Sequence, residues 1–404
     1  MLYACQKQPD EPCHSIWRTT TQTQGIRMST QTTVLMNDFQ RQWQEIGEQV
    51  LEATRTVGQS GWYVLGSAVK QFEQNLASQW QLPHVIGCAN GLDAIEIGLR
   101  VLGIKPGDKV LTTPLSAFAT TLAIMRCGGI PIFVDVDSRG LLDLQIAEQA
   151  LQSDPSIRFM VPVHLYGHAL CLRTLQRLRD QYSLQIVEDC AQAIGACSGG
   201  QPVGSIGQMA ATSFYPTKNL GAMGDGGAVI CNDAELALKA RCLRDYGQSQ
   251  KYLHSEFGLN SRLDELHAAI LDAAMLPKLG NWTQRRREIA QRYIDGIEHP
   301  KVRLPSKPED SDSVWHLFPL IVDSHREQLQ ASLAAAGVHS GVHYPILITS
   351  QPALLALGEP QVFGSLNNAQ HYATNELSIP IHPYLNDDEV TRVIDAINTW
   401  TTPE

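Results

Sequence analysis

The stretch Ser213-Phe-Tyr-Pro-Thr-Lys218-Asn-Leu-Gly-Ala-Met-Gly-Asp-Gly-Gly227 places one lysine between a serine-aromatic step and a run of glycines. This arrangement is typical of a lysine that is presented to a phosphorylated cofactor. A lysine amine with a lowered pKa becomes a nucleophile and can hold an aldehyde cofactor as a Schiff base. The stretch therefore indicates Lys218 as a candidate for holding pyridoxal 5'-phosphate (PLP).

The segment Gln185-Ile-Val-Glu-Asp189, upstream of the lysine, has the pattern of a buried strand that ends in a carboxylate. Such a carboxylate can pair with the protonated pyridine nitrogen of PLP. Each feature alone is weak evidence, because most lysines are solvated and most Glu-Asp pairs at strand ends are exposed loop charges. The order of strand, acid, loop and lysine is what indicates a shared site.

Short apolar runs alternate with helical stretches through the middle of the chain. The runs cover residues 84–88, 109–113, 131–136, 159–163, 184–187, 209–214 and 228–231. Buried strands separated by helices predict an α/β fold with a mostly parallel central sheet flanked by helices. Ligands of such sheets bind at the carboxyl ends of the strands, where the acid and the lysine segment can converge.

The chain is expected to divide into three parts. Residues 37–280 are predicted to form a large PLP-binding α/β domain, and residues 281–404 a smaller C-terminal α+β domain. Residues 1–36 are predicted to be an N-terminal extension. Within it, residues 1–27 are polar and lack the apolar core of a signal peptide, and Met28 opens a new polar stretch. A start codon assigned too far upstream is the preferred interpretation, and a disordered tail is the alternative.

Composition excludes several classes of protein. The chain has 404 residues and a net charge of −10, which argues against a nucleic-acid binder that would need clustered Lys and Arg. No apolar run approaches the length of a membrane helix, so a soluble protein with no membrane partner is expected. Nine cysteines without CxxC spacing predict a reducing cytoplasm and no metal site.

Several motifs follow one another in a recognisable order from about Ser60 onward. They are Ser60-Gly-Trp-Tyr-Val-Leu-Gly66, Cys88-Ala-Asn-Gly91-Leu-Asp-Ala94, Val161-Pro-Val-His-Leu-Tyr-Gly167, Glu188-Asp-Cys-Ala-Gln-Ala193, the lysine stretch, Gly258-Leu-Asn-Ser-Arg-Leu-Asp-Glu265 and Val342-His-Tyr-Pro345. In this order the chain resembles the sugar aminotransferases of the DegT/DnrJ/EryC1/StrS family. The resemblance implies the aspartate aminotransferase-like (type I) fold, PLP as cofactor and a homodimer with shared active sites.

The resemblance also implies the roles of the two catalytic candidates. Lys218 would hold PLP and move a proton between the substrate carbon and the cofactor, and Asp189 would keep the pyridine nitrogen protonated. Family members with a histidine in place of the lysine catalyse dehydration, so Lys218 favours transamination.

Further cofactor contacts are carried over position by position. Gly91 and Leu92 open a helix whose backbone amides would bind the PLP phosphate, and many family members carry threonine at the Leu92 position. Ser213 matches a phosphate-contacting serine, and Asn260 matches an asparagine that reaches the same phosphate from the partner subunit. Phe118 matches an aromatic position that lies against the pyridine face, and Gln192 matches a position that contacts the cofactor's 3′ oxygen or stacks near the ring. A buried core phenylalanine is the alternative reading of Phe118.

Tyr215, Lys251, His343 and Tyr344 fall at positions that line the sugar-nucleotide cleft in relatives. The alternative readings are that His343-Tyr344-Pro345 is a turn and that Lys251 is simply solvated.

The predicted function is transfer of an amino group from glutamate to a nucleotide-linked keto-deoxysugar, with amination at C3 favoured. The motifs resemble most those of the dTDP-3-oxo-deoxyhexose 3-aminotransferases. One alternative is a PLP-binding relative that does not transaminate, either dehydratase-like or regulatory. A non-PLP nucleotide-binding scaffold is a third possibility, which would depend on the glycines of the lysine stretch alone.

Overall fold

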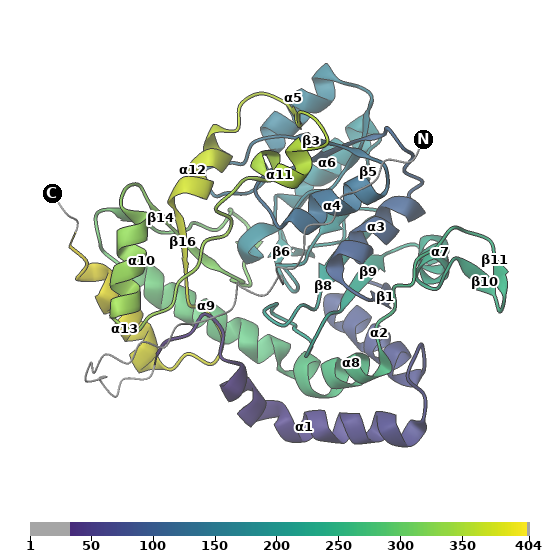
Figure 1. Cartoon of the computed structure of the whole chain (residues 1–404), viewed down its shortest axis with the longest axis horizontal. Helices are drawn as coiled ribbons and strands as arrows, with labels where there is room; N and C mark the ends of the chain where they lie inside the picture. The colour runs from purple at the N-terminus through teal and green to yellow at the C-terminus, as the bar shows by residue number, and fades with distance from the viewer. Residues whose placement is uncertain (1–32, 402–404) are drawn as a thin grey trace, which may run out of the picture. The chain divides into compact units, whose positions relative to one another are not determined.

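The computed structural model describes residues 33–401, and an eight-stranded sheet forms their centre (Figure 1). The strand order is β1-β9-β8-β5-β4-β2-β3-β15. The strands are β1 (His84–Cys88), β2 (Lys109–Thr112), β3 (Ile130–Phe133), β4 (Ile157–Met160), β5 (Gln185–Asp189), β8 (Met209–Ser213), β9 (Gly227–Cys231) and β15 (Gln361–Val362). Only β9 runs antiparallel to its neighbours in this sheet, so the predicted mostly parallel sheet is confirmed.

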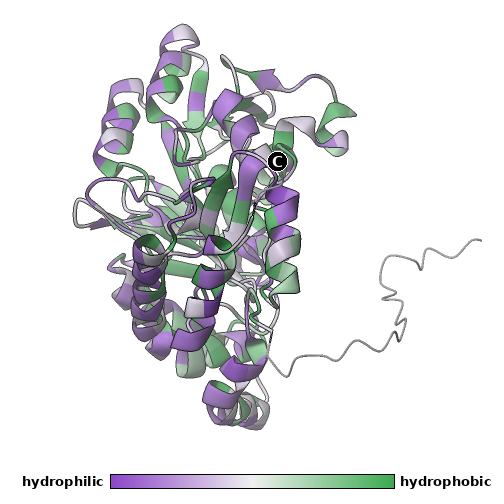
Figure 2. Cartoon of the chain, turned by 90° about the vertical axis from the view of Figure 1, so that its left-hand side faces the viewer, coloured by the Kyte–Doolittle hydropathy of each residue, from purple (hydrophilic) through white to green (hydrophobic). Residues whose placement is uncertain are grey.

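Helices cover both faces of the sheet. They are α2 (Ser67–Trp80), α3 (Gly91–Val101), α4 (Phe118–Arg126), α5 (Leu144–Ser153), α6 (Leu172–Tyr182), α7 (Ala234–Arg244) and α8 (Glu265–Ile270). Successive strand residues point to opposite faces. Val229 of β9 therefore packs in the cluster with α3 and α7, while Ala228 and Ile230 pack with α2 and α8. Figure 2 shows the same division, with hydrophobic strands inside and hydrophilic residues on the outer helix surfaces.

The N-terminal helix α1 (Phe39–Ser60) is amphipathic and buries one face. The Asp38 side chain caps it by accepting a hydrogen bond from the Arg41 backbone N–H. Just before the helix, Val34 is buried and its N–H donates to the Gly337 carbonyl. Most of the predicted N-terminal extension, residues 1–32, lies outside the described residues.

The C-terminal part begins with the long helix α9 (Leu279–Gly296). A three-stranded antiparallel sheet follows in the order β12-β14-β16, from β12 (Val302–Arg303), β14 (Phe318–Val322) and β16 (Glu376–Ile379). Helices α10 (Arg326–Ala335), α11 (Pro352–Leu355), α12 (Asn367–Asn375) and α13 (Asp387–Asn398) complete this part. The division of the chain at residues 280 and 281 stays a prediction.

Short strands connect the C-terminal part to the preceding residues. Strand β13 (Ser311–Asp312) pairs with β6 (Cys197–Ser198). Strand β6 in turn pairs with β7 (Gln201–Pro202), and β15 extends the large sheet beside β3. A separate hairpin consists of β10 (Gln248–Gln250) and β11 (Leu253–His254). Short 3-10 turns lie at Leu165–Gly167, Leu276–Lys278 and Ile348–Ser350, and a π-helical turn lies at Leu271–Met275.

A search of residues 33–401 for membrane spans finds no helix that is both long and apolar enough to cross a bilayer.

Glu376 of β16 is a fully buried carboxyl group. One oxygen accepts a hydrogen bond from the His343 backbone N–H, and the other is hydrogen-bonded to the Ser378 hydroxyl, each at 2.5 Å. Burial raises the pKa of Glu376 to about 8, although these two hydrogen bonds and the positive charge of Arg326 act in the opposite direction. The neutral acid is therefore the form that the fold favours.

We expect Glu376→Gln to change how stability depends on pH. The folded pKa lies above the unfolded value, so the stabilisation is fully present below the unfolded pKa and is lost as pH rises through about 8. The wild-type thermal midpoint should fall relative to that of Glu376→Gln between about pH 5 and about pH 8, because the amide does not titrate. Melting curves that stay parallel over this range would contradict the assignment.

Candidate functional site

Lys218 lies on the turn between β8 and β9, where the sequence places the candidate cofactor lysine. Its backbone N–H donates to the Tyr215 carbonyl at 2.8 Å. A Cβ on Gly221 would lie 2.3 Å from the Pro216 carbonyl oxygen, so this turn requires a glycine there. Burial lowers the pKa of Lys218 to about 8, and the negative charge of Asp189 acts in the opposite direction. An amine with this pKa is a better nucleophile and base at neutral pH than an exposed lysine.

Asp189 ends β5 and is almost completely buried. Its Oδ2 accepts a hydrogen bond from the Thr120 hydroxyl at 2.8 Å, and its Oδ1 accepts one from the Ala191 N–H at 3.1 Å. The Asp189 backbone is also bonded to Pro162 and His164. The carboxylate is thus held in one orientation at the edge of the sheet where Lys218 lies. Thr120 stands two residues after Phe118 and was not predicted from the sequence as a site residue.

The preceding residue, Glu188, supports this strand end from the interior. Its carboxylate accepts four hydrogen bonds, from His164 Nε2 at 2.9 Å and from the N–H groups of Gly204, Ile206 and Gly207. His164, Glu188 and Cys190 also offer ligand atoms within 4.8 Å of one another. Because the carboxylate is already satisfied by protein donors, the cluster supports β5 without needing a metal ion.

The N-terminus of α3 forms a cradle for an anion beside this edge. Asn90 caps the helix by accepting a hydrogen bond from the Asp93 N–H at 2.8 Å. In the described part of the chain the amides of Gly91 and Leu92 have no acceptor, and helix N-termini attract anions. A Cβ on Gly91 would lie 2.7 Å from the Cβ of Ser213, so Ser213 directly adjoins this helix start.

The two ring-contact candidates are placed differently. Gln192 links two neighbours, since its Oε1 accepts from the Tyr166 N–H at 2.7 Å and its Nε2 donates to the Tyr344 hydroxyl at 3.2 Å. Phe118 begins α4, is partly buried and packs against a small apolar cluster. That cluster consists of Phe133, Ile348 and Leu354, with Met125 beside it.

A cavity of about 350 Å³ opens at Lys218 and collects several of the predicted residues. Its lining includes the predicted Gln192, Tyr215, Lys218, His343 and Tyr344. Its other polar lining residues were not predicted from the sequence; they are Asn37, Thr217, Arg286 and His316. One signal could have found Arg286, because it shares the apolar face of α9 with Trp282, Ile289 and Tyr293.

Two imidazoles line this cavity, the buried His316 and the partly buried His343, and each is hydrogen-bonded through its Nδ1 atom. His343 Nδ1 lies 2.9 Å from the Ser378 hydroxyl oxygen, and His316 Nδ1 lies 3.1 Å from Asn219 Oδ1. Burial, followed by the positive charge of Lys218, lowers the pKa of His343 to about 4 and that of His316 well below its usual value. Both rings are therefore neutral at neutral pH.

Lys251 and Asn260 are not brought into the cavity. Both are exposed, on or next to the β10–β11 hairpin, and Lys251 Nζ lies 5.3 Å from the centre of the Tyr252 ring. Their predicted roles are not visible within a single chain, and they stay predictions.

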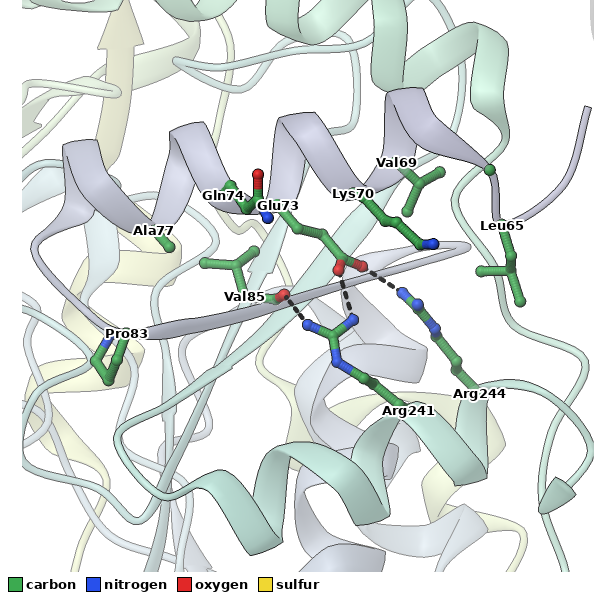
Figure 3. A pocket seen from close by; sticks show the side chains of 11 residues that line it. Leu65, Val69, Lys70, Glu73, Gln74, Ala77, Pro83, Val85, Arg241 and Arg244 are labelled. Atoms are coloured by element: carbon green, nitrogen blue, oxygen red, sulfur yellow. Dashed lines mark hydrogen bonds and ion pairs between the residues drawn. The ribbon is translucent and has the colours of Figure 1, made fainter. Parts of the chain in front are cut away.

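A second cavity lies between α2 and α7 and is lined by charged side chains (Figure 3). Glu73 pairs with both Arg241 and Arg244 at 2.5 Å, and Arg241 also donates to the Val85 carbonyl. The close-up shows the carboxylate pointing between the two guanidinium groups. Since these charges are paired with one another, the cluster fastens α2 to α7 and β1 rather than presenting reactive groups.

The residues around Lys218 fit PLP. A lysine with a lowered pKa, a fixed buried carboxylate and unpaired helix N-terminal amides meet at one edge of the sheet, and PLP needs these three groups as an attachment point, a pyridine partner and a phosphate site. A Cβ on Gly227 would lie 2.4 Å from the Asn90 carbonyl carbon, so the backbone of β9 can approach the helix start only because this residue is glycine.

Comparison with known proteins agrees with this site. Residues 44–398 match the model of the DegT/DnrJ/EryC1/StrS aminotransferase family. The chain is 40% identical over 365 residues to a dTDP-3-amino-3,4,6-trideoxy-alpha-D-glucose transaminase of Streptomyces venezuelae. The aligned region covers 90% of this chain and 95% of that protein.

Solved structures show the same fold. The S. venezuelae protein DesV, in complex with a ketimine intermediate, superposes with a TM-score of 0.87 at 40% identity and covers 92% of this chain and 99% of that one. NtdA from Bacillus subtilis, with bound cofactor PMP, gives a TM-score of 0.80 at 30% identity over 91% of this chain and 85% of that one. The chain therefore belongs to the DegT/DnrJ/EryC1/StrS aminotransferase family and is a PLP-dependent aminotransferase with the fold that this family shares.

Proposed function

We propose that the protein transfers an amino group from glutamate to C3 of a nucleotide-linked keto-deoxysugar. The observation that carries the proposal is the cavity at Lys218, which adjoins a fixed carboxylate and an anion cradle at the same edge of the sheet. The S. venezuelae relative, whose name specifies a 3-amino sugar carried by dTDP, supports the choice of sugar and carbon. Lys218 and the family membership do not favour the dehydratase-like or regulatory alternative.

The residues nearest the cofactor have distinct roles in this proposal. PLP supplies an electron sink when it is bound. Asp189 holds a proton on the pyridine nitrogen, and Thr120 keeps the Asp189 carboxylate oriented for this. The backbone amides of Gly91 and Leu92, with Ser213, bind the phosphate. Phe118 and Gln192 stay proposed ring contacts.

Lys218 is the proposed attachment point and proton carrier. Its amine is free to accept a proton from the donor carbon once the donor has replaced it, and burial keeps its pKa near the working pH. Tyr215, His343 and Tyr344 line the same cavity and are proposed to orient the sugar. Free cysteines in the described part of the chain fit the proposed cytoplasmic location.

The proposed active unit is a homodimer in which Asn260 and Lys251 enter the partner's site. Exposed aromatic residues near these positions support this, because large exposed apolar groups mark interaction surfaces. Phe257 is 91% exposed, Tyr252 83% and Trp62 62%. Residues 63–64 are hydrogen-bonded through their backbones to residues 264–265. The segment that carries Trp62 therefore lies beside the segment that follows Phe257 in the chain.

We expect Lys218→Ala to lose the visible absorption band that purified wild-type protein shows with PLP. Glutamate should shift this band toward shorter wavelength in the wild type, and the variant should lose transamination by a factor of about 10⁴ or more because attachment and proton transfer both fail. Lys239→Ala is the matched control, since Lys239 is exposed on α7. If the absorption band of PLP bound to the wild type does not change when glutamate is added, the result would instead favour the non-transaminating alternative or another amino donor.

Shared sites predict that two inactive variants rescue each other. Asn260→Ala should weaken PLP binding, and Lys218→Ala should be inactive. When the two are refolded together, half of the dimers are mixed and each carries one intact site, so activity should return to about one quarter of the wild-type value. Refolding each variant alone is the control. No recovery on mixing, with mixed dimers demonstrated by mass, would contradict the sharing of Asn260 across the interface.

A further inference from the structure

Arg286 is a buried cation without a counter-ion in the described residues. It is 5% exposed, and burial lowers its pKa to about 10. Two other arginines of α9 do have a counter-ion: Arg285 and Arg292 each form an ion pair with Asp387 at 2.8 Å. A buried charge without a partner is costly, and proteins keep such groups mainly where a ligand supplies the opposite charge.

The hydrogen bonds of Arg286 leave one edge of its guanidinium unused. Nη1 donates to the Ile381 carbonyl at 2.8 Å and, at longer range, to the carbonyls of Trp315 and His316. Nε and Nη2 have no acceptor within residues 33–401. The Nε–Nη2 edge presents two parallel N–H groups, which is the geometry that binds a carboxylate in a bidentate manner.

Arg286 lines the Lys218 cavity and also a smaller hollow that Lys218, Asn37 and Thr217 border as well. Among residues 33–401, no aspartate or glutamate lines the Lys218 cavity. His316 and His343 are neutral there, because burial and the charge of Lys218 lower their pKa values. Asp189 lies outside this lining, so the charged side chains that line the cavity are cationic and favour an anionic ligand, in a protein with a net charge of −10.

Arg286 lines the cavity together with Lys218, and this position fits the carboxylate of an amino acid donor better than the diphosphate of a nucleotide sugar. The amine of an amino acid donor must react where the Lys218 amine lies, and its α-carboxylate is attached to the same carbon. A carboxylate near Lys218 is thus unavoidable when the donor is bound. The diphosphate of a nucleotide sugar is separated from the keto carbon by part of the sugar ring, so it does not need a cation this deep in the cavity.

We propose that Arg286 binds a carboxylate of the amino donor through its Nε–Nη2 edge. The inference rests on the proposed transamination and assigns the donor side of the same site. Arg286 is a donor-specific binding residue, and it contributes little to binding of the keto sugar.

The test separates the two half-reactions in the holoenzyme. The first is followed spectrally with glutamate and the PLP form, and the second with the nucleotide-linked amino sugar and the PLP form, which runs the sugar half in reverse. For Arg286→Gln, kcat/KM for glutamate should fall by about 100-fold or more, and for Arg286→Lys by about 10-fold. The sugar half-reaction should change by less than about 3-fold in both variants.

Arg287→Gln is the matched control. Arg287 is the next residue on α9, is partly buried and donates to the Ser313 carbonyl, but it does not line the Lys218 cavity. Glutarate, a dicarboxylate that cannot react, gives a second measurement. Calorimetric titration should detect its binding to wild-type and Arg287→Gln holoenzyme and should show at least about a 10-fold weaker affinity for Arg286→Gln.

Three outcomes would overturn the inference. They are unchanged glutamate kinetics in Arg286→Gln, an equal loss in both half-reactions, or glutarate affinity that does not depend on Arg286. A wild-type enzyme that reacts with glutamate but with none of the nucleotide sugars would refute the proposed sugar substrate only, because the donor half-reaction and the glutarate titration would still test Arg286.

Discussion

A fixed carboxylate facing a desolvated lysine is the constraint on which the rest of the site depends. Asp189 cannot turn away, because Thr120 and the Ala191 amide hold both of its oxygens. Lys218 loses part of its basicity through burial, and the charge of Asp189 limits that loss. The balance keeps the amine protonated only part of the time near neutral pH, which is what a group needs if it is to serve as both nucleophile and base.

The parallel sheet places these groups by its topology rather than by local sequence. Strands β5 and β8 are neighbours and parallel, so Asp189 and the start of the lysine turn emerge at the same edge. Antiparallel β9 returns beside β8 and brings Gly227 against Asn90 at the start of α3. Glu188, one residue before Asp189, faces the opposite side of the strand and fastens it to the loop at residues 204–207. Because successive strand residues point to opposite faces, Asp189 faces the site while Glu188 stabilises the same strand end from the other face.

The sequence predicts the elements whose signals are local. The apolar run at residues 84–88 has the same bounds as β1, and the run at 228–231 begins one residue after the start of β9. The ordered motifs predict the positions of Lys218 and Asp189. Arg286 and His316 reach the cavity from the C-terminal part of the chain. The apolar face of α9 indicates that Arg286 is buried, but the local sequence does not indicate that either side chain enters the Lys218 cavity. Lys251 and Asn260 lie outside the cavity of one chain. The role predicted for Asn260 requires a second subunit, which a single chain does not contain.

The hydrogen bonds behind His343 connect the buried acid of β16 to the cavity. When Glu376 is ionised, Ser378 donates to it and the hydroxyl oxygen can only accept from His343, so the ring carries its proton on Nδ1 and offers a lone pair at Nε2. When Glu376 is protonated, the chain of donors reverses: the acid donates to Ser378, Ser378 donates to Nδ1, and Nε2 carries the proton. Because the pKa of Glu376 is raised to about 8, the protonated arrangement is favoured at neutral pH. His343 then presents a hydrogen-bond donor to the cavity, the form suited to a carbonyl or hydroxyl oxygen of a sugar, while the ring itself stays uncharged beside Lys218.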